Sequence, residues 1–201
     1  MRIMIVGQKW LAAETLKLCL RLGHTVVKVV APTADDRLIH TAIETDTHAV
    51  AIAGRLEGHH VLDGTDLIIA AHAHCFITAD ARQKARHGAI GYHPSLLPLH
   101  RGRDAIKWAI RMHEPVTGGT VYQMNDRADA GPIIVQDWCF IQKNDNAESL
   151  WRRELGPMAL RLFEFSLSFI ISDDYESHCQ DELISTWEPA LSDVRLLKFS
   201  S

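Results

Sequence analysis

Short apolar runs alternate with segments of helical spacing along the first half of the chain. Four of these runs are almost wholly apolar, as strands buried on both faces of a parallel sheet are. The predicted strands are 2–6, 25–30, 66–70 and 89–92. The predicted helices are 10–22, 35–45 and 79–86. This alternation predicts an α/β fold, with a mostly parallel sheet flanked by helices on both faces.

The pattern changes after residue 115. Segments 120–124 and 133–138 favour strands, and the polar stretch 125–131 separates them. A long helix is expected over 145–171, and Pro157 should kink or divide it because proline cannot continue the hydrogen-bond ladder. From 173 onward the pattern is weak. We therefore expect one domain over 1–172 and a C-terminal tail, 173–201, that forms no separate domain.

Composition narrows the class of protein. A chain of 201 residues with 47% hydrophobic and 23% charged residues suits a single soluble domain. The net charge of -4 gives no reason to expect binding to nucleic acid or to a membrane. The longest apolar stretches fall short of the roughly 20 residues that span a bilayer. Four scattered cysteines without a C-x-x-C pair favour a reduced, cytoplasmic protein.

Ligands of open α/β sheets collect beyond the carboxyl ends of the strands. Segments 7–9 and 71–77, and the chain from His93 onward, lie at such ends. The first of them keeps only one glycine of the G-x-G-x-x-G fingerprint, Gly7, which argues against a dinucleotide.

Two further hypotheses at these ends are weak. His72 and His74, followed by Cys75, could point the same way and bind a metal, but no third ligand is evident, so no metal is expected. Ser95 lacks the G-x-S-x-G context of a nucleophile, and we expect it to shape a turn.

His93 is the stronger candidate for chemistry. Pro94 and Pro98 restrict the loop that follows it, and a rigid loop at a strand end suits a titratable group. Asp129 lies between small residues in the polar stretch 125–131. An aspartate beside a histidine would hold the orientation and tautomer of the ring. The sequence alone does not show that the two residues meet.

The segment "HPSLLPLHRG", followed by "GGTVYQMNDRADAGPIIVQ", resembles the signature region of the folate-dependent formyltransferases. The resemblance covers roughly residues 1–170 and implies a Rossmann-like formyltransferase fold, with 1–172 as the catalytic domain. It implies an enzyme whose formyl donor is 10-formyltetrahydrofolate. It also implies that His93 and Asp129 are catalytic. At the third catalytic position, an asparagine in the family, this chain has Gly91.

The resemblance further implies that two loops hold the pterin of the donor. The expected binding residues are His74, Cys75, Phe76 and Ile77 in one loop and Asn125, Asp126, Arg127 and Ala128 in the other. For Phe76 and Ile77, ordinary packing in the core under the loop is an alternative of nearly equal weight.

The resemblance leaves the acceptor open. We expect a small-molecule amine, with water as the alternative, which would make the protein a hydrolase that releases formate. A folate-binding module with little turnover is a third hypothesis. Lys9, Arg103 and Asp104 border the expected crevice, although surface charge explains them equally well. No nucleic-acid or membrane partner is expected, and a homodimer is allowed.

Gly91 favours the hydrolase and the binding module, because glycine offers no side chain to hydrogen-bond the oxygen that becomes negative during acyl transfer. A water could stand in its place. The side chain of His100 or Arg101 could reach in instead. Alternatively, the site has lost most of its activity, since one missing donor typically costs about 10²–10³ in rate.

Overall fold

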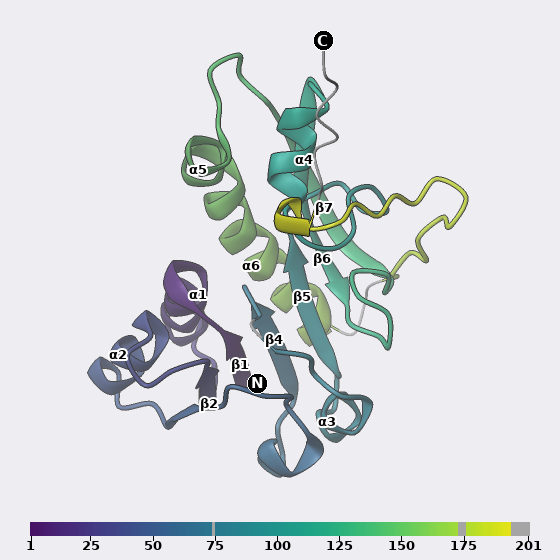
Figure 1. Cartoon of the computed structure of the whole chain (residues 1–201). Coiled ribbons are helices and arrows are strands. Elements are labelled where there is room, and N and C mark those ends of the chain that lie inside the picture. The colour runs from purple at the N-terminus through teal and green to yellow at the C-terminus, as the bar shows by residue number, and fades with distance from the viewer. Residues whose placement is uncertain (74, 173–175, 194–201) are drawn as a thin grey trace.

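A seven-stranded sheet, in the order β3-β2-β1-β4-β5-β6-β7, organises the chain (Figure 1). The structure is a computed structural model that describes residues 1–73, 75–172 and 176–193. The first five strands in this order are parallel, and β6 and β7 are antiparallel. The strands are β1 (Arg2–Gly7), β2 (Thr25–Ala31), β3 (Ala49–Ala51), β4 (Leu67–Ala71), β5 (Ala89–His93), β6 (Val116–Gln123) and β7 (Ile133–Phe140). The predicted mostly parallel α/β fold is confirmed.

Helices cover both faces of this sheet. They are α1 (Lys9–Arg21), α2 (Arg37–Glu44), α3 (Ala79–Lys84), α4 (Ala105–Arg111), α5 (Ala147–Leu150) and α6 (Gly156–Ser172), with short 3-10 turns at Gly58–His60 and Leu191–Asp193. Alternate residues of β1 divide between two cores because successive side chains of a strand point to opposite faces. Ile3 and Ile5 pack with α1, α2 and α6, whereas Met4 and Val6 pack with α3.

The long C-terminal helix is divided just before Pro157, one of the two outcomes that the sequence predicts. The turn Trp151–Leu155 widens into a π-helix, and α6 then begins at Gly156 and carries Pro157 in its first turn. A proline has no N–H to continue the ladder, and its first-turn position makes that loss harmless. The helical run Ala147–Ser172 is long and apolar enough to cross a membrane, but half of its most apolar window is buried, as in a core helix.

Strand β3 and helix α4 were not predicted, and neither were the 3-10 turns at Gly58–His60 and Leu191–Asp193. Strand β3 is an apolar segment of only three residues, none of them buried, which is short even for a strand. Helix α4 is also short and follows the loop after His93. Both lie at places where tertiary contacts, rather than periodicity, determine the structure.

The C-terminal segment, residues 176–193, lies against the body of the protein and appears in yellow beside α4 in Figure 1. His178 exchanges backbone hydrogen bonds with Ile133 of β7. The indole of Trp108 on α4 donates to the carbonyl of Pro189, at 2.8 Å. The division into a domain over 1–172 and a tail over 173–201 stays a prediction, but this part of the tail is packed onto the domain.

Candidate active site

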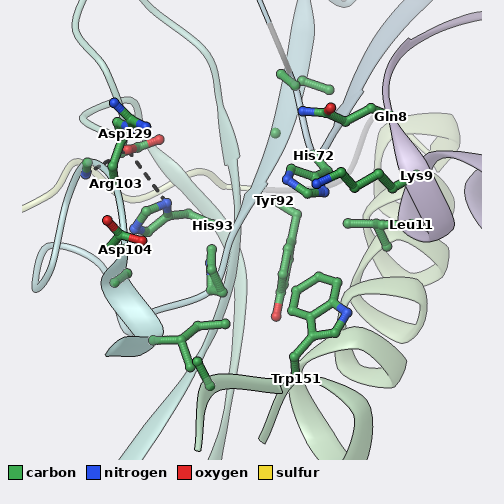
Figure 2. A pocket seen from close by; sticks show the side chains of 18 of the residues that line it. Gln8, Lys9, Leu11, His72, Tyr92, His93, Arg103, Asp104, Asp129 and Trp151 are labelled. Carbon is green, nitrogen blue, oxygen red and sulfur yellow. Dashed lines mark hydrogen bonds and ion pairs between the residues drawn. The ribbon is translucent and has the colours of Figure 1, made fainter. Parts of the chain in front are cut away.

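A cavity of about 1100 Å³ opens at the carboxyl ends of the central strands. Lys9 follows β1, His72 follows β4 and His93 ends β5, and all three line the cavity (Figure 2). These are the three strand ends at which the sequence predicts a crevice. The prediction is confirmed because adjacent parallel strands bring their carboxyl ends to one edge of the sheet.

His93 is buried at this edge, with 6% of its surface exposed. Its Nε2 lies 2.7 Å from the backbone carbonyl oxygen of His100. A carbonyl can only accept, so Nε2 carries the proton of this hydrogen bond. The neutral ring therefore keeps its lone pair on Nδ1, and Nδ1 is the nitrogen available for chemistry.

Asp129 faces that nitrogen. Its Oδ2 lies 3.5 Å from Nδ1 of His93, as the dashed line in Figure 2 shows. Oδ2 also accepts from the backbone N–H of Gly102, at 2.9 Å, and Oδ1 accepts from the hydroxyl of Tyr122, at 2.7 Å. The fold thus brings together the two candidate catalytic residues, which the sequence alone could not show to meet.

Tyr122 is a site residue that the sequence interpretation missed. It lines the cavity from β6 and is almost fully buried. Burial raises the pKa of its phenol well above the usual 10, and the charge of Asp129 raises it further. Its phenol therefore remains a hydrogen-bond donor. No local pattern in the sequence marks Tyr122 as a site residue, because its place beside Asp129 depends on the pairing of β5 with β6.

His100 and Arg101 do not reach into the cavity. The imidazole of His100 lies between the carboxylates of Glu114 and Glu188, at 2.8 and 3.1 Å. The guanidinium of Arg101 donates to Gln180 and Glu182. The hypothesis that either side chain replaces the asparagine is therefore wrong, because buried charged groups stay with their partners. His100 contributes its backbone carbonyl instead.

Ser95 is structural, as expected. Its hydroxyl donates to the carbonyl of Leu99, at 2.6 Å, and its own carbonyl accepts from the hydroxyl of Thr120, at 2.7 Å. These bonds close the loop after His93 on itself. The hydroxyl is therefore engaged in a turn and does not face a substrate.

The described residues of the two loops expected to hold the pterin, 75–77 and 125–128, lie beside the cavity rather than in its wall. Ile77 is fully buried in the core, and Phe76 is 43% exposed under the guanidinium of Arg55. Arg82 connects the loops, since it donates to the carbonyl of Ile77 and pairs with the carboxylate of Asp126. His74 lies outside the described residues. The pterin-binding role of both loops stays a prediction.

The remaining residues of those loops have local partners. Cys75 is half-buried, and burial raises the pKa of its thiol. Asn125 accepts a hydrogen bond from the backbone of Arg127, whose side chain pairs with Glu182. Ala128 directly precedes Asp129 in the sequence. Among the residues that the structure describes, no three His, Cys, Asp or Glu side chains are grouped to hold a metal ion.

The wall of the cavity beyond His93 is partly aromatic. Trp151 begins the π-helical turn and lies 6.4 Å from the ring of Tyr92, between ring centroids. The Tyr92 hydroxyl donates to the carbonyl of Leu155, at the other end of the same turn. Figure 2 shows these two rings below Lys9 and Leu11, with Arg103 and Asp104 on the side of His93. The π-helical turn thus presents an aromatic surface to the cavity. Such turns often occur at functional sites.

A side-chain carboxylate of the chain itself binds the backbone at the start of α1. The backbone N–H of Lys9 donates to both carboxylate oxygens of Asp36, at 3.0 and 3.1 Å. Free amides at a helix N-terminus attract anions. Since Asp36 already fills this position, an anionic ligand would rely on the side chains of Lys9 and Arg103 instead.

Comparison with known proteins identifies the family. The family model described as "Formyl transferase" matches residues 45–157, more than half of the chain, and this stretch contains His93 and Asp129. The chain belongs to the formyl transferase family. The resemblance inferred from its signature segments is confirmed.

The individual relatives of this chain differ in the activities for which they are named. Mitochondrial 10-formyltetrahydrofolate dehydrogenase of Mus musculus is 29% identical over 94% of the chain, but the chain spans only 22% of that protein's length. An N-formyltransferase of Helicobacter canadensis, solved with folinic acid and dTDP-3-aminofucose, is similar at a TM-score of 0.79 and 20% identity. The alignment covers 97% of this chain and 72% of that one.

A second solved structure supports the fold. Glycinamide ribonucleotide transformylase 1 of Symbiobacterium toebii aligns with a TM-score of 0.76 and 21% identity, over 90% of this chain and 94% of its own. At these identities the two structural matches establish a shared fold.

Proposed function

We propose that this protein transfers the formyl group of 10-formyltetrahydrofolate to an amine of a small-molecule acceptor. The observation that carries the proposal is the pair formed by buried His93, at the end of β5, and half-buried Asp129, in the loop between β6 and β7, on a cavity of about 1100 Å³. Ligand sites are usually about 300–1,000 Å³. The cavity thus offers room for a formyl donor and a small acceptor side by side.

His93 would act on the formyl oxygen. When the acceptor amine attacks the formyl carbon, a C–N bond forms and negative charge develops on that oxygen. Protonated His93 donates to it from Nδ1, since Nε2 is held by the carbonyl of His100. Asp129 balances the charge of the imidazolium.

The same pair would move the proton that the reaction displaces. The attacking amine loses a proton as its bond to carbon forms, and the carboxylate of Asp129 accepts it. The bond from carbon to N10 of the donor then breaks, and this nitrogen takes up the proton. The products are a formamide and tetrahydrofolate, and atoms and charge balance.

The two predicted loops would hold the donor. Their backbone groups suit the hydrogen-bonding edge of a pterin, and the cavity reaches toward them at Ala73 and Met124. Arg82 would fix the spacing between the loops, because it joins Ile77 to Asp126. We propose Cys75, Phe76, Asn125, Arg127 and the others of this set as donor-binding residues on that ground.

The opposite part of the cavity would hold the acceptor. Trp151 and Tyr92 offer an apolar face for a sugar or a base, and Lys9 and Arg103 offer positive charge for an anionic group. An amine on a sugar or a nucleotide fits this combination. The solved relative with a bound aminosugar nucleotide supports the same class. We further propose a cytoplasmic location and allow for a homodimer.

Hydrolysis is the second candidate. The relative named 10-formyltetrahydrofolate dehydrogenase matches 94% of this chain, and water could take the position of the amine. The same residues would then act, and formate would replace the formamide.

One assay separates these activities. The purified protein is incubated with 10-formyltetrahydrofolate, alone and with a panel of aminosugar nucleotides and simple amines, and tetrahydrofolate, formate and formamide are measured. Formamide that requires both amine and His93 supports transfer. Formate released without an amine supports hydrolysis. Donor binding without either product, in the wild type and in His93→Ala alike, would contradict both and favour a binding module.

A further inference from the structure

The ring of Tyr122 fills the space that a side chain at position 91 would need. Gly91 of β5 and Tyr122 of β6 are direct partners across the antiparallel pair. A Cβ added to Gly91 would lie 3.3 Å from Cε1, Cζ and Oη of Tyr122. That separation is tighter than an ordinary van der Waals contact between such atoms, so any side chain at 91 would displace the phenol.

The hydroxyl of Tyr122 gives the two oxygens of the Asp129 carboxylate different partners. Oδ1 accepts from Tyr122, at 2.7 Å. Oδ2 is thereby turned toward His93, at 3.5 Å from Nδ1, and it also accepts from the backbone of Gly102. A carboxylate fixed at both oxygens has a single orientation, which a carboxylate held at one oxygen lacks.

Asp129 needs such a restraint because its backbone is strained. Its φ is +52°, in the left-handed region that a non-glycine residue adopts only at a cost in free energy. Gln180 of the C-terminal segment donates to the backbone carbonyl of Asp129, at 2.9 Å, while Tyr122 donates to its side chain. The strained residue is therefore clamped from two sides.

We propose that Tyr122 is a positioning residue, whose hydroxyl keeps Oδ2 of Asp129 directed at His93, and that Gly91 is needed to leave room for it. The glycine is then a requirement of this site and no loss of function. This inference rests on the proposed function only where turnover is measured.

The first test is Tyr122→Phe, which removes the hydroxyl and keeps the ring. We expect kcat to fall by about 10- to 100-fold, within what a misplacement of about 1 Å can cost, with the Kd for 10-formyltetrahydrofolate little changed. Ser166→Ala is the matched control, because it removes a buried hydroxyl bonded within α6 and leaves the cavity alone. Turnover of Tyr122→Phe equal to that of wild type would overturn the proposal.

The second test adds Gly91→Ala in both backgrounds. In wild type the new methyl pushes the phenol, so turnover should fall at least tenfold. In Tyr122→Phe the hydroxyl is already gone, so the same methyl should change turnover less than threefold. The free energy of unfolding, measured for all four proteins, should change by similar amounts in both backgrounds. Equal fold-effects on turnover in the two backgrounds would contradict the proposal.

A third measurement needs no turnover. The ¹⁵N chemical shift of His93 Nδ1 reports its carboxylate neighbour, so it should change in Tyr122→Phe and stay constant in Ser166→Ala. An unchanged shift in Tyr122→Phe would overturn the proposal, whatever the activity. If wild type shows no His93-dependent product while this shift moves as expected, the proposed function fails and the positioning role stands.

Discussion

The loops that carry His93 and Asp129 are held in different ways. The loop after His93 is braced by its own neighbours, since Ser95 bonds to Leu99 and to Thr120 of the adjacent strand. The loop of Asp129 has few bonds of its own. It depends on Gly102 and on Gln180, which are remote in the sequence.

We call the bonds of Ser95 to Leu99 and Thr120 the brace. We call the bonds of Asp129 to Gly102 and Gln180 the clamp. Loss of one bond around Ser95 leaves others that fix His93 at the end of β5. The Asp129 loop is strained, and beside the nearby Tyr122 it depends on Gly102 and Gln180 from other parts of the chain. We therefore expect substitutions around Asp129 to affect turnover first and substitutions around Ser95 to affect stability first.

Asp129→Asn should have the largest effect. The amide keeps the shape of the side chain but removes the charge that balances protonated His93. We expect kcat to fall on the order of 10²–10⁴, the contribution of a general acid–base group. The decrease is measured as the rate of tetrahydrofolate formation at saturating donor. A variant within threefold of wild type would mean that Asp129 only shapes the loop.

Gln180→Ala and Ser95→Ala compare the two kinds of support directly. Gln180 donates to the carbonyls of Asp129 and Gly131, at 2.9 and 2.7 Å. Either variant removes side-chain hydrogen bonds worth about 1 kcal/mol each, so both should lower the free energy of unfolding. We expect kcat to fall on the order of tenfold in Gln180→Ala, as from a displaced catalytic group. Ser95→Ala should stay within threefold.

Both quantities are measured on the same protein preparations, by urea unfolding and by initial rates. If Ser95→Ala loses as much turnover as Gln180→Ala at equal stability, the distinction between brace and clamp is wrong.

The same distinction explains what the sequence could predict. Strands β1, β2, β4 and β5 were predictable because each is a short apolar run buried on both faces. His93 was predictable because its restraints, Pro94 and Pro98, stand beside it in the sequence. The role of Tyr122 was not predictable, because it depends on the cross-strand partner Gly91, and no local sequence pattern reveals the register of two strands.

The C-terminal segment shows the same limit. Residues 176–193 have weak periodicity, and no sequence pattern predicts that Gln180 reaches the Asp129 loop or that Glu188 meets His100. These contacts are made by single polar side chains at long sequence separation. Periodicity reports the burial of apolar faces and carries no information about such pairs.

The smallest expected effect is an acid-dependent weakening of the clamp. Hydrogen bonds from Arg101, and then from Arg127, lower the pKa of Glu182 from its usual 4.5 to about 2. A folded-state pKa below the unfolded one contributes stability that is complete above pH 4.5 and is lost as pH falls through about 2. Glu182 is exposed, so salt screens this contribution.

Glu182→Gln should therefore lower the Tm slightly at pH 6 and make no difference near pH 2. The two melting curves, followed from pH 6 to pH 2 at low salt, should converge as Glu182 takes up its proton. At 1 M salt the difference at pH 6 should shrink, because the Debye length is then only about 3 Å. A constant difference at all pH values would show that the Arg101 pair does not hold the C-terminal segment by charge. The contribution of the C-terminal segment to holding Asp129 would then rest on the hydrogen bonds of Gln180.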